Sequence, residues 1–138
     1  MEPFAPYGHA LVSVALYGLV VQVLNALTGI RKGSENLEPG AGYEADYDNP
    51  SYRLDRTYMN SIEMMVFYVA LVFAAVLAGA NPFMVNLFAT LGVILRIAIN
   101  VVYLRGIGKA YGGLRTMLVI AASVCNLGLF ILVLTAVF

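Results

Sequence analysis

Charged residues are scarce in this sequence. Lys and Arg number 8, Asp and Glu number 8, and together they make up 12% of the 138 residues, against about 25% in a typical soluble domain. Hydrophobic residues make up 61%, and the mean hydropathy is +0.82. So few charges cannot cover a soluble domain, and they also exclude intrinsic disorder and a basic nucleic-acid-binding surface. The composition predicts an integral membrane protein with no nucleic acid among its partners.

Cysteine and histidine occur once each, and the sequence has no tryptophan. The single cysteine, Cys125, excludes a disulfide within the chain and a cysteine-based metal cluster. The single histidine, His9, disfavours a histidine metal site. We therefore expect no metal in the functional site.

Long apolar runs dominate what remains. Each is long enough for a helix that crosses about 30 Å of hydrocarbon, which takes about 20 residues. The runs cover about residues 8–30, 57–79, 82–104 and 114–138. They are too long for the strands of a membrane barrel, which have about 9–11 residues. We expect one all-α domain over residues 1–138, a four-helix transmembrane bundle with a long loop at about 31–56.

The connections differ in length. Only Ala80 and Asn81 separate the second run from the third, which predicts a tight antiparallel pair of helices with Pro82 in the first turn of the third. In the long loop, the stretch from Asp48 to Ser51 predicts a turn. We expect no long helix in this loop.

The basic residues lie toward one side of this arrangement. They are Arg31, Lys32, Arg53, Arg56, Arg96, Arg105, Lys109 and Arg115. Because cytoplasmic loops are enriched in Lys and Arg, we expect the first and third connections in the cytoplasm and both termini on the non-cytoplasmic side. No basic residue precedes the first run, so we interpret this run as an uncleaved span and not as a signal peptide.

Two ionisable residues fall inside the predicted spans, Glu63 and Arg96. Charges within a membrane are costly and usually face the bundle interior or a polar cavity. At 1.5 Å per residue from the basic end, Glu63 lies about 9 Å deep and Arg96 about 12 Å deep. The two residues could therefore pair, on one chain or between two.

Other polar residues share helix faces with Glu63 and Arg96 or lie at helix ends nearby. Together, these polar residues could form one pocket. The candidates are Arg31, Arg53, Arg56, Asn60, Glu63, Arg96, Asn100, Tyr103 and Arg115. Arginine forks bind carboxylates, so the pocket fits a small zwitterion with several carboxylates, such as glutathione. An arginine near the thiol would favour the nucleophilic thiolate. The same residues could instead be interfacial anchors, one structural ion pair and hydrogen bonds between helices.

The segment from Arg53 to Glu63 resembles the second-helix signature R-x2-R-x3-N-x2-E of the MAPEG family, the membrane-associated proteins in eicosanoid and glutathione metabolism. The four spans and the loop lengths are similar as well. The resemblance implies a homotrimer that binds its co-substrate glutathione between neighbouring subunits at the cytoplasmic side. It also implies a lipophilic second substrate that arrives from the bilayer.

The resemblance further implies roles for individual residues. Those that would hold glutathione are Arg31, Arg53, Arg56, Asn60, Glu63 and Tyr103, with Arg96 and Asn100 in the same pocket. Arg115 would stabilise the thiolate and is the candidate catalytic residue. Met59 and Ile99 stand where prostaglandin E synthase of this family has an arginine and a histidine, so that subtype is disfavoured.

Three functional hypotheses remain open. The favoured one is a glutathione transferase, with or without glutathione peroxidase activity, that acts on lipophilic electrophiles. The alternatives are a non-catalytic lipid- or partner-binding protein of the same fold and a small multidrug or proton-coupled transporter. The transporter is disfavoured because the first span lacks an acidic residue. The short loops and the lack of an N-x-[ST] glycosylation sequon, in which x is not proline, favour a bacterial inner membrane over the endoplasmic reticulum.

Overall fold

The computed structural model describes residues 2–38, 40–109 and 111–138. Within these ranges every regular element is helical: a short 3-10 helix η1 (Glu2–Tyr7) and the four helices α1 (Gly8–Ser34), α2 (Pro50–Leu77), α3 (Pro82–Leu104) and α4 (Leu114–Val137). In this described part of the chain, four helices are long and apolar enough to cross a membrane. The predicted all-α bundle is confirmed.

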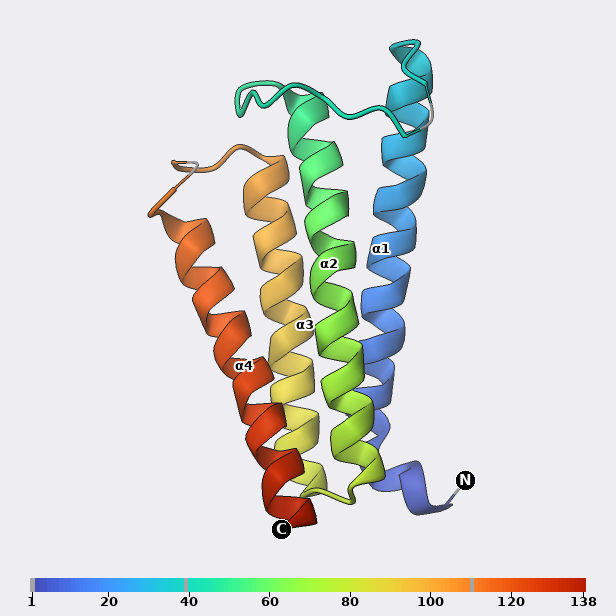
Figure 1. Ribbon diagram of the computed structural model, residues 1–138, viewed down its shortest axis with the longest axis vertical. Helices are drawn as coiled ribbons and strands as arrows, with labels where there is room; N and C mark the ends of the chain where they lie inside the picture. Colours follow the sequence, from blue (N-terminus) through green and yellow to red (C-terminus); the bar gives the residue numbers. More distant parts are fainter. Residues whose placement is uncertain (1, 39, 110) are drawn as a thin grey trace.

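The helices lie side by side with their long axes roughly aligned (Figure 1). The first loop, residues 35–49, and the third loop, residues 105–113, lie at the upper end in that view, which we call the loop end. The α2–α3 turn and both chain termini lie at the opposite end. α2 and α3 each pack against all three other helices and together form the middle of the bundle.

At the loop end, α1 and α2 extend beyond the predicted spans, so the first loop is shorter than the expected 31–56. α2 begins at Pro50 and not near Thr57, because the Asn49 side chain accepts a hydrogen bond from the backbone N–H of Ser51 (2.9 Å) and caps the helix. The stretch predicted as a turn is thus a helix start. Arg53 and Arg56 consequently belong to the first two turns of α2.

Tyrosine hydroxyls cross-link the bundle interior. The Tyr17 hydroxyl on α1 donates to the Ser61 carbonyl on α2 (3.0 Å), and the Tyr68 hydroxyl on α2 donates to the Ala89 carbonyl on α3 (2.8 Å). A buried hydroxyl needs such a partner, because an unmet hydrogen bond in an apolar interior costs about 1–3 kcal/mol. These bonds fix how α1, α2 and α3 are rotated relative to one another.

The predicted tight turn between α2 and α3 is confirmed. α2 ends where Gly79 adopts φ +67°, a left-handed conformation that favours glycine. Asn81 then caps α3 by accepting from the backbone N–H of Met84 (3.2 Å), and Pro82 occupies the first turn. The turn aligns α3 antiparallel to α2, so that Arg56 and Asn60 lie beside the C-terminal part of α3.

Candidate functional site

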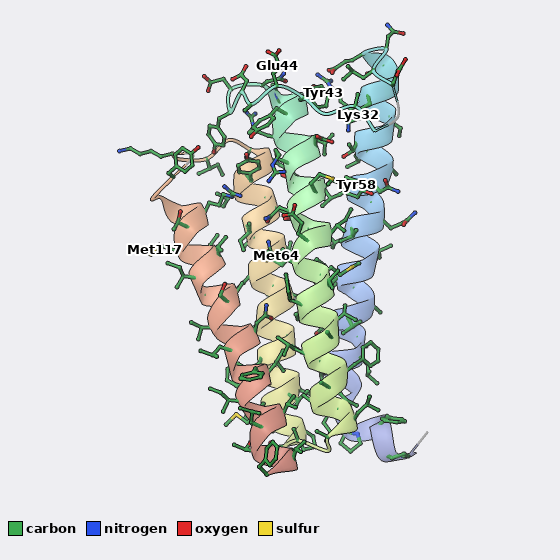
Figure 2. All side chains as sticks on the ribbon, viewed as in Figure 1. Lys32, Tyr43, Glu44, Tyr58, Met64 and Met117 are labelled. Carbon is green, nitrogen blue, oxygen red and sulfur yellow. The ribbon has the colours of Figure 1, made fainter. Side chains whose placement is uncertain are left out.

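Polar side chains concentrate at the loop end, whereas the opposite half of the bundle is mostly carbon (Figure 2). There, α2, α3 and α4 bring five of the predicted site residues around one narrow cavity, which Thr57 and Ile99 also line. We call these five the arginine cluster: Arg56, Asn60, Asn100, Tyr103 and Arg115.

Arg115, in the first turn of α4, stacks on Tyr103 of α3. The guanidinium carbon lies 4.3 Å from the ring centroid, a cation–π contact that holds the side chain over the cavity. Its Nε atom is buried, and within the described part of the chain it has no hydrogen-bond partner. A guanidinium with an unused buried donor is suited to an anion.

Asn100 offers a second unused donor. Its side chain is 5% exposed, and its Oδ1 atom accepts from the Ser61 hydroxyl (3.1 Å). Its Nδ2 atom has no partner among the residues that the structure describes. The cavity wall thus carries unfilled donors from both α3 and α4, and each would gain from an acceptor on a ligand.

Arg96 lies beneath the arginine cluster and not in its wall. It is 5% exposed, donates through one terminal nitrogen to Asn60 Oδ1 (2.9 Å), and borders a small internal gap with Tyr17, Tyr68 and Asn126. This hydrogen bond fixes the orientation of the Asn60 amide. Arg96 is therefore placed to act on a ligand through Asn60.

Glu63 is separate from this group. Its side chain is exposed, and no ion pair joins it to Arg96 within the described residues. Positions three apart on a helix are rotated by about 60°, so Asn60 faces α3 while Glu63 faces outward. The pairing considered from the sequence does not form on one chain.

Arg31 is engaged in a network that joins the ends of α1 and α2. Its Nε atom lies 2.7 Å from Glu35 Oε1 and donates to the Ser51 hydroxyl (2.8 Å). The Ser51 and Tyr43 hydroxyls donate to Glu35 at 2.7 and 2.8 Å. These hydrogen bonds hold the pKa of the Glu35 carboxyl below its ordinary value, and the hydrogen bond from Ser51 is the largest cause.

Arg53 ties the first loop to α3. It donates to the Tyr47 carbonyl (2.7 Å), the Asp48 carbonyl (3.1 Å) and the Leu104 carbonyl (3.3 Å). Within one chain, Arg31 and Arg53 are therefore structural and do not enter the arginine cluster. The helical spacing in the sequence placed Arg53 on the same face as Arg56. It could not show that backbone carbonyls accept hydrogen bonds from Arg53.

A wider chamber of about 350 Å³ continues from the arginine cluster toward the loop end. It shares Arg56, Tyr103 and Arg115 with the cluster and adds three tyrosines that the sequence-based site did not include: Tyr47, Tyr52 and Tyr111. The rings of Tyr47 and Tyr103 pack in a tilted arrangement, 5.4 Å between centroids, which connects the first loop to α3. For Tyr47 and Tyr52, the signal in the sequence was the density of tyrosines in the first loop and at the start of α2, whereas no such signal marked Tyr111 in the third loop.

The fold and this site define a four-helix membrane protein with a basic, tyrosine-lined polar chamber at one end. The sequence model of the MAPEG family matches residues 8–135. The chain therefore belongs to the MAPEG family and is a multi-pass integral membrane protein. No curated protein and no solved structure matches the chain significantly.

Proposed function

We propose that this protein is a membrane-bound glutathione transferase that stabilises the glutathione thiolate. The thiolate is conjugated to a lipophilic electrophile or used to reduce a lipophilic hydroperoxide. The observation that carries the proposal is Arg115, stacked on Tyr103 with a buried, unused Nε donor beside Arg56. Membership of the MAPEG family supports the substrate class.

The residues of the chamber and of the adjoining arginine cluster match the groups of glutathione. Its two carboxylates suit Arg56 and the tyrosine hydroxyls, and its amide oxygens suit the free Asn100 amide. Its sulfur would lie near Arg115, where a positive charge in a site shielded from water lowers the pKa of a thiol. No metal is needed, since the guanidinium supplies the charge.

Conjugation then proceeds in one displacement. The thiol loses its proton to solvent, the thiolate sulfur attacks the electrophilic carbon, and the leaving group departs with the bonding electrons. For a hydroperoxide, the thiolate attacks the terminal oxygen and releases an alcohol. A second glutathione condenses with the resulting sulfenic acid to give the disulfide and water.

A homotrimer would complete the site. Arg31 and Glu63 are predicted to hold glutathione, yet on one chain they lie outside the arginine cluster, and Glu63 is exposed midway along a membrane helix. A second copy packed against this face would cover a costly charge and bring these side chains toward a neighbour's chamber. We also propose that the loop end faces the cytoplasm, where glutathione is abundant.

The second substrate would arrive from the bilayer. Apolar side chains continue along the Arg115 side of α4, with Leu118 and Val119 one turn after it. A lipophilic electrophile could approach along them to the sulfur without crossing the polar chamber.

The decisive experiment is an ultraviolet difference titration of the detergent-solubilised protein with glutathione. The native protein should give a saturable thiolate band that Arg115→Ala abolishes. Arg105→Ala, which removes an exposed arginine in the third loop, is the matched control and should behave as native. Binding without a thiolate band would favour a non-catalytic role, and no binding at all would refute the proposal.

A further inference from the structure

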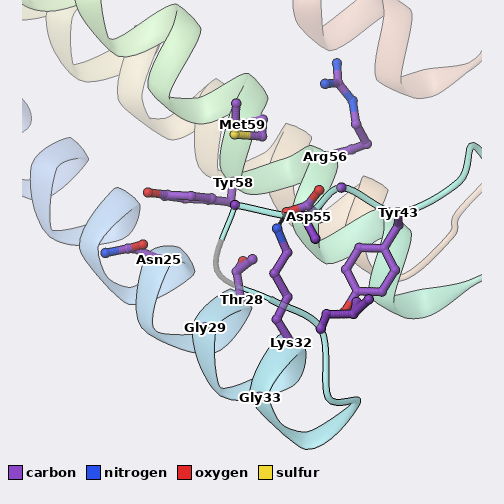
Figure 3. A pocket seen from close by; sticks show the side chains of 14 residues that line it. Asn25, Thr28, Gly29, Lys32, Gly33, Tyr43, Asp55, Arg56, Tyr58 and Met59 are labelled. Atoms are coloured by element: carbon purple, nitrogen blue, oxygen red, sulfur yellow. Dashed lines mark ion pairs between the residues drawn. The ribbon is translucent and has the colours of Figure 1, made fainter.

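A second cavity at the loop end lies between α1, the first loop and α2 (Figure 3). It measures about 760 Å³, and we call it the α1–α2 pocket. Arg56 borders it, but Figure 3 shows the guanidinium pointing away from the pocket, and this side chain belongs to the arginine cluster. Among the described lining residues, the charges that face the pocket are therefore those of Lys32 on α1 and Asp55 on α2.

The wall of the pocket contains a buried hydroxyl without a partner. Thr28 is 4% exposed, and within the part of the chain that the structure describes its Oγ1 atom has no hydrogen-bond partner. Elsewhere in the bundle, the hydroxyls of Ser13, Thr57 and Ser123 donate to the carbonyl four residues earlier in their own helices. Thr28 makes no such bond, and Figure 3 shows its side chain pointing from α1 toward α2. Its hydroxyl is thus available to a ligand.

One ion pair spans the pocket. Lys32 Nζ lies 2.7 Å from Asp55 Oδ1, and both side chains are mostly buried. This contact uses one of the three donors of an ammonium and one of the two oxygens of a carboxylate. The pocket therefore offers donors on its α1 side and an acceptor on its α2 side, with no net charge.

The neutral pair favours a ligand without net charge. A ligand with a net charge would leave that charge unpaired in a partly buried site, which is costly. A zwitterion instead has an anionic group for Lys32 and a cationic group for Asp55. Each charge of the pair then gains a partner of opposite sign, and the hydrogen bonds between ionised groups are strong.

The two halves of such a zwitterion can be specified further. The carboxylate of Asp55 only accepts hydrogen bonds, so a primary ammonium with its three N–H donors suits it better than a quaternary ammonium, which has none. The anionic half must accept from both the Lys32 ammonium and the Thr28 hydroxyl. A phosphate has enough oxygens for both donors. The chemistry of the wall therefore fits a phosphoethanolamine group.

The pocket also has the depth of a lipid headgroup. The apolar stretch of α1 ends at Ile30, and the basic residues that follow mark the boundary between hydrocarbon and water. From Lys32 to Asn25 the pocket extends inward by about 10 Å of helix. Its inner end is lined by the exposed side chains of Asn25 and Met59. Acyl chains could therefore leave the pocket sideways between α1 and α2.

From these observations we infer that the α1–α2 pocket binds the headgroup of a zwitterionic phospholipid with a primary ammonium, phosphatidylethanolamine. Its phosphate accepts from the Lys32 ammonium and the Thr28 hydroxyl, and its ammonium donates to Asp55. This inference goes beyond the proposed glutathione chemistry and does not depend on it. Soluble phosphoethanolamine carries the same groups, so the test must separate the two sources.

The test is native mass spectrometry of the full chain in mild detergent, with phosphatidylethanolamine as the probe. The comparison lipids are phosphatidylcholine, phosphatidylglycerol and diacylglycerol with the same acyl chains, which lack the N–H donors, the positive charge and both charges, respectively. We expect saturable binding of phosphatidylethanolamine and binding weaker by about tenfold or more for the other three. Equal or tighter binding of any of the three would overturn the assignment. Displacement of the lipid by millimolar phosphoethanolamine would also overturn it.

Thr28 provides variants that should leave the fold intact. Thr28→Val keeps the shape but loses the hydroxyl, so it should weaken phosphatidylethanolamine binding about tenfold, the effect of one hydrogen bond to a charged group. Thr28→Ser keeps the hydroxyl and should stay within about threefold of native. Without lipid, Thr28→Val should unfold at the same or a higher temperature than native, because the hydroxyl that it removes has no partner. Unchanged lipid binding in Thr28→Val would refute the site.

Asp55→Asn tests the charge argument. It leaves Lys32 without its counter-ion, so the pocket becomes positive and the preference should shift from phosphatidylethanolamine to phosphatidylglycerol. Glu44→Gln, which removes an exposed carboxylate in the first loop, is the matched control and should keep the native preference. A preference for phosphatidylethanolamine that persists in Asp55→Asn would contradict the inference. If Asp55→Asn does not fold, the comparison of native protein with Thr28→Val decides the question by itself.

Discussion

The guanidinium of Arg115 lies 4.3 Å from the ring centroid of Tyr103, and this stack joins α4 to α3. α4 begins only at Leu114, after a third loop with three glycines at positive φ. The position of Arg115 is thus defined more by the tyrosine beneath it than by the loop before it. The orientation of the proposed thiolate-stabilising group depends on an aromatic ring on another helix.

Replacing Tyr103 tests this dependence. Tyr103→Ala should weaken glutathione thiolate formation about tenfold, because a partly desolvated cation–π contact contributes about 1–2 kcal/mol. Tyr103→Phe keeps the ring and should stay within about threefold of native. Titration of the thiolate band measures both. If Tyr103→Ala and Tyr103→Phe weaken thiolate formation equally, the Tyr103 hydroxyl and not its cation–π contact with Arg115 is important.

Arg96 and Asn60 should act as one unit. If Arg96 works through its 2.9 Å bond to Asn60, then Arg96→Gln should weaken glutathione binding in the native background and have little further effect in Asn60→Ala. The coupling free energy from such a double-mutant cycle should be about 1–3 kcal/mol. Calorimetric titration of all four proteins gives the cycle. Additive losses would indicate that Arg96 contacts glutathione by itself.

The Glu35 network should respond to acid. The pKa of Glu35 is lower in the folded protein than its ordinary value of 4.5. The ionised Glu35 side chain therefore contributes its full stabilisation at pH values above 4.5. The contribution is lost as the pH falls through the depressed folded pKa. The protection factors for hydrogen exchange in residues 43–51, which are corrected for the intrinsic pH dependence of amide exchange, should therefore fall at acidic pH.

The matched variants for this prediction lie in the same loop. Glu35→Gln should show fast exchange at every pH, since the charged acceptor for the Ser51 and Tyr43 hydroxyls is gone. Glu38→Gln should follow the native profile. An identical pH response of native protein and Glu35→Gln would contradict the assignment to Glu35.

Gly79 should resist substitution. Its φ of +67° means that Gly79→Ala places a Cβ in the left-handed region, which costs about 1–2 kcal/mol. Gly18→Ala, at an open position within α1 where φ is not in that region, should be neutral or stabilising. Thermal unfolding in detergent distinguishes the two. A neutral Gly79→Ala would mean that the turn relaxes at little cost.

Much of the fold could be predicted from hydropathy. α3 runs from Pro82 to Leu104, as its apolar run indicates, because a proline and a capping asparagine define its start and no polar extension follows its end. α2 is different: its first two turns are polar, so hydropathy missed them. The helix begins at Pro50 because local capping, which acts irrespective of polarity, sets its start.

The candidate site could be predicted only in part. Helical spacing placed Arg56 and Asn60 on one face, and the structure brings them together with residues of α3 and α4. The same spacing could not separate Arg53 from Arg56, because the partners of Arg53 are backbone carbonyls in a loop without a periodic pattern. It also could not show that Arg96 donates to Asn60, whereas Glu63 forms no ion pair with Arg96 among the residues that the structure describes.

Both chain ends lie at the end of the bundle opposite the arginine cluster. A reporter enzyme or affinity tag fused to either terminus would lie across the bilayer from the arginine cluster and its chamber. Tagged protein is thus suitable for all of the ligand titrations without cleavage of the tag. Donor and acceptor fluorophores placed on the same terminus of separately labelled copies would lie on one side of the membrane, so energy transfer between mixed copies could report their association without obstructing ligand access.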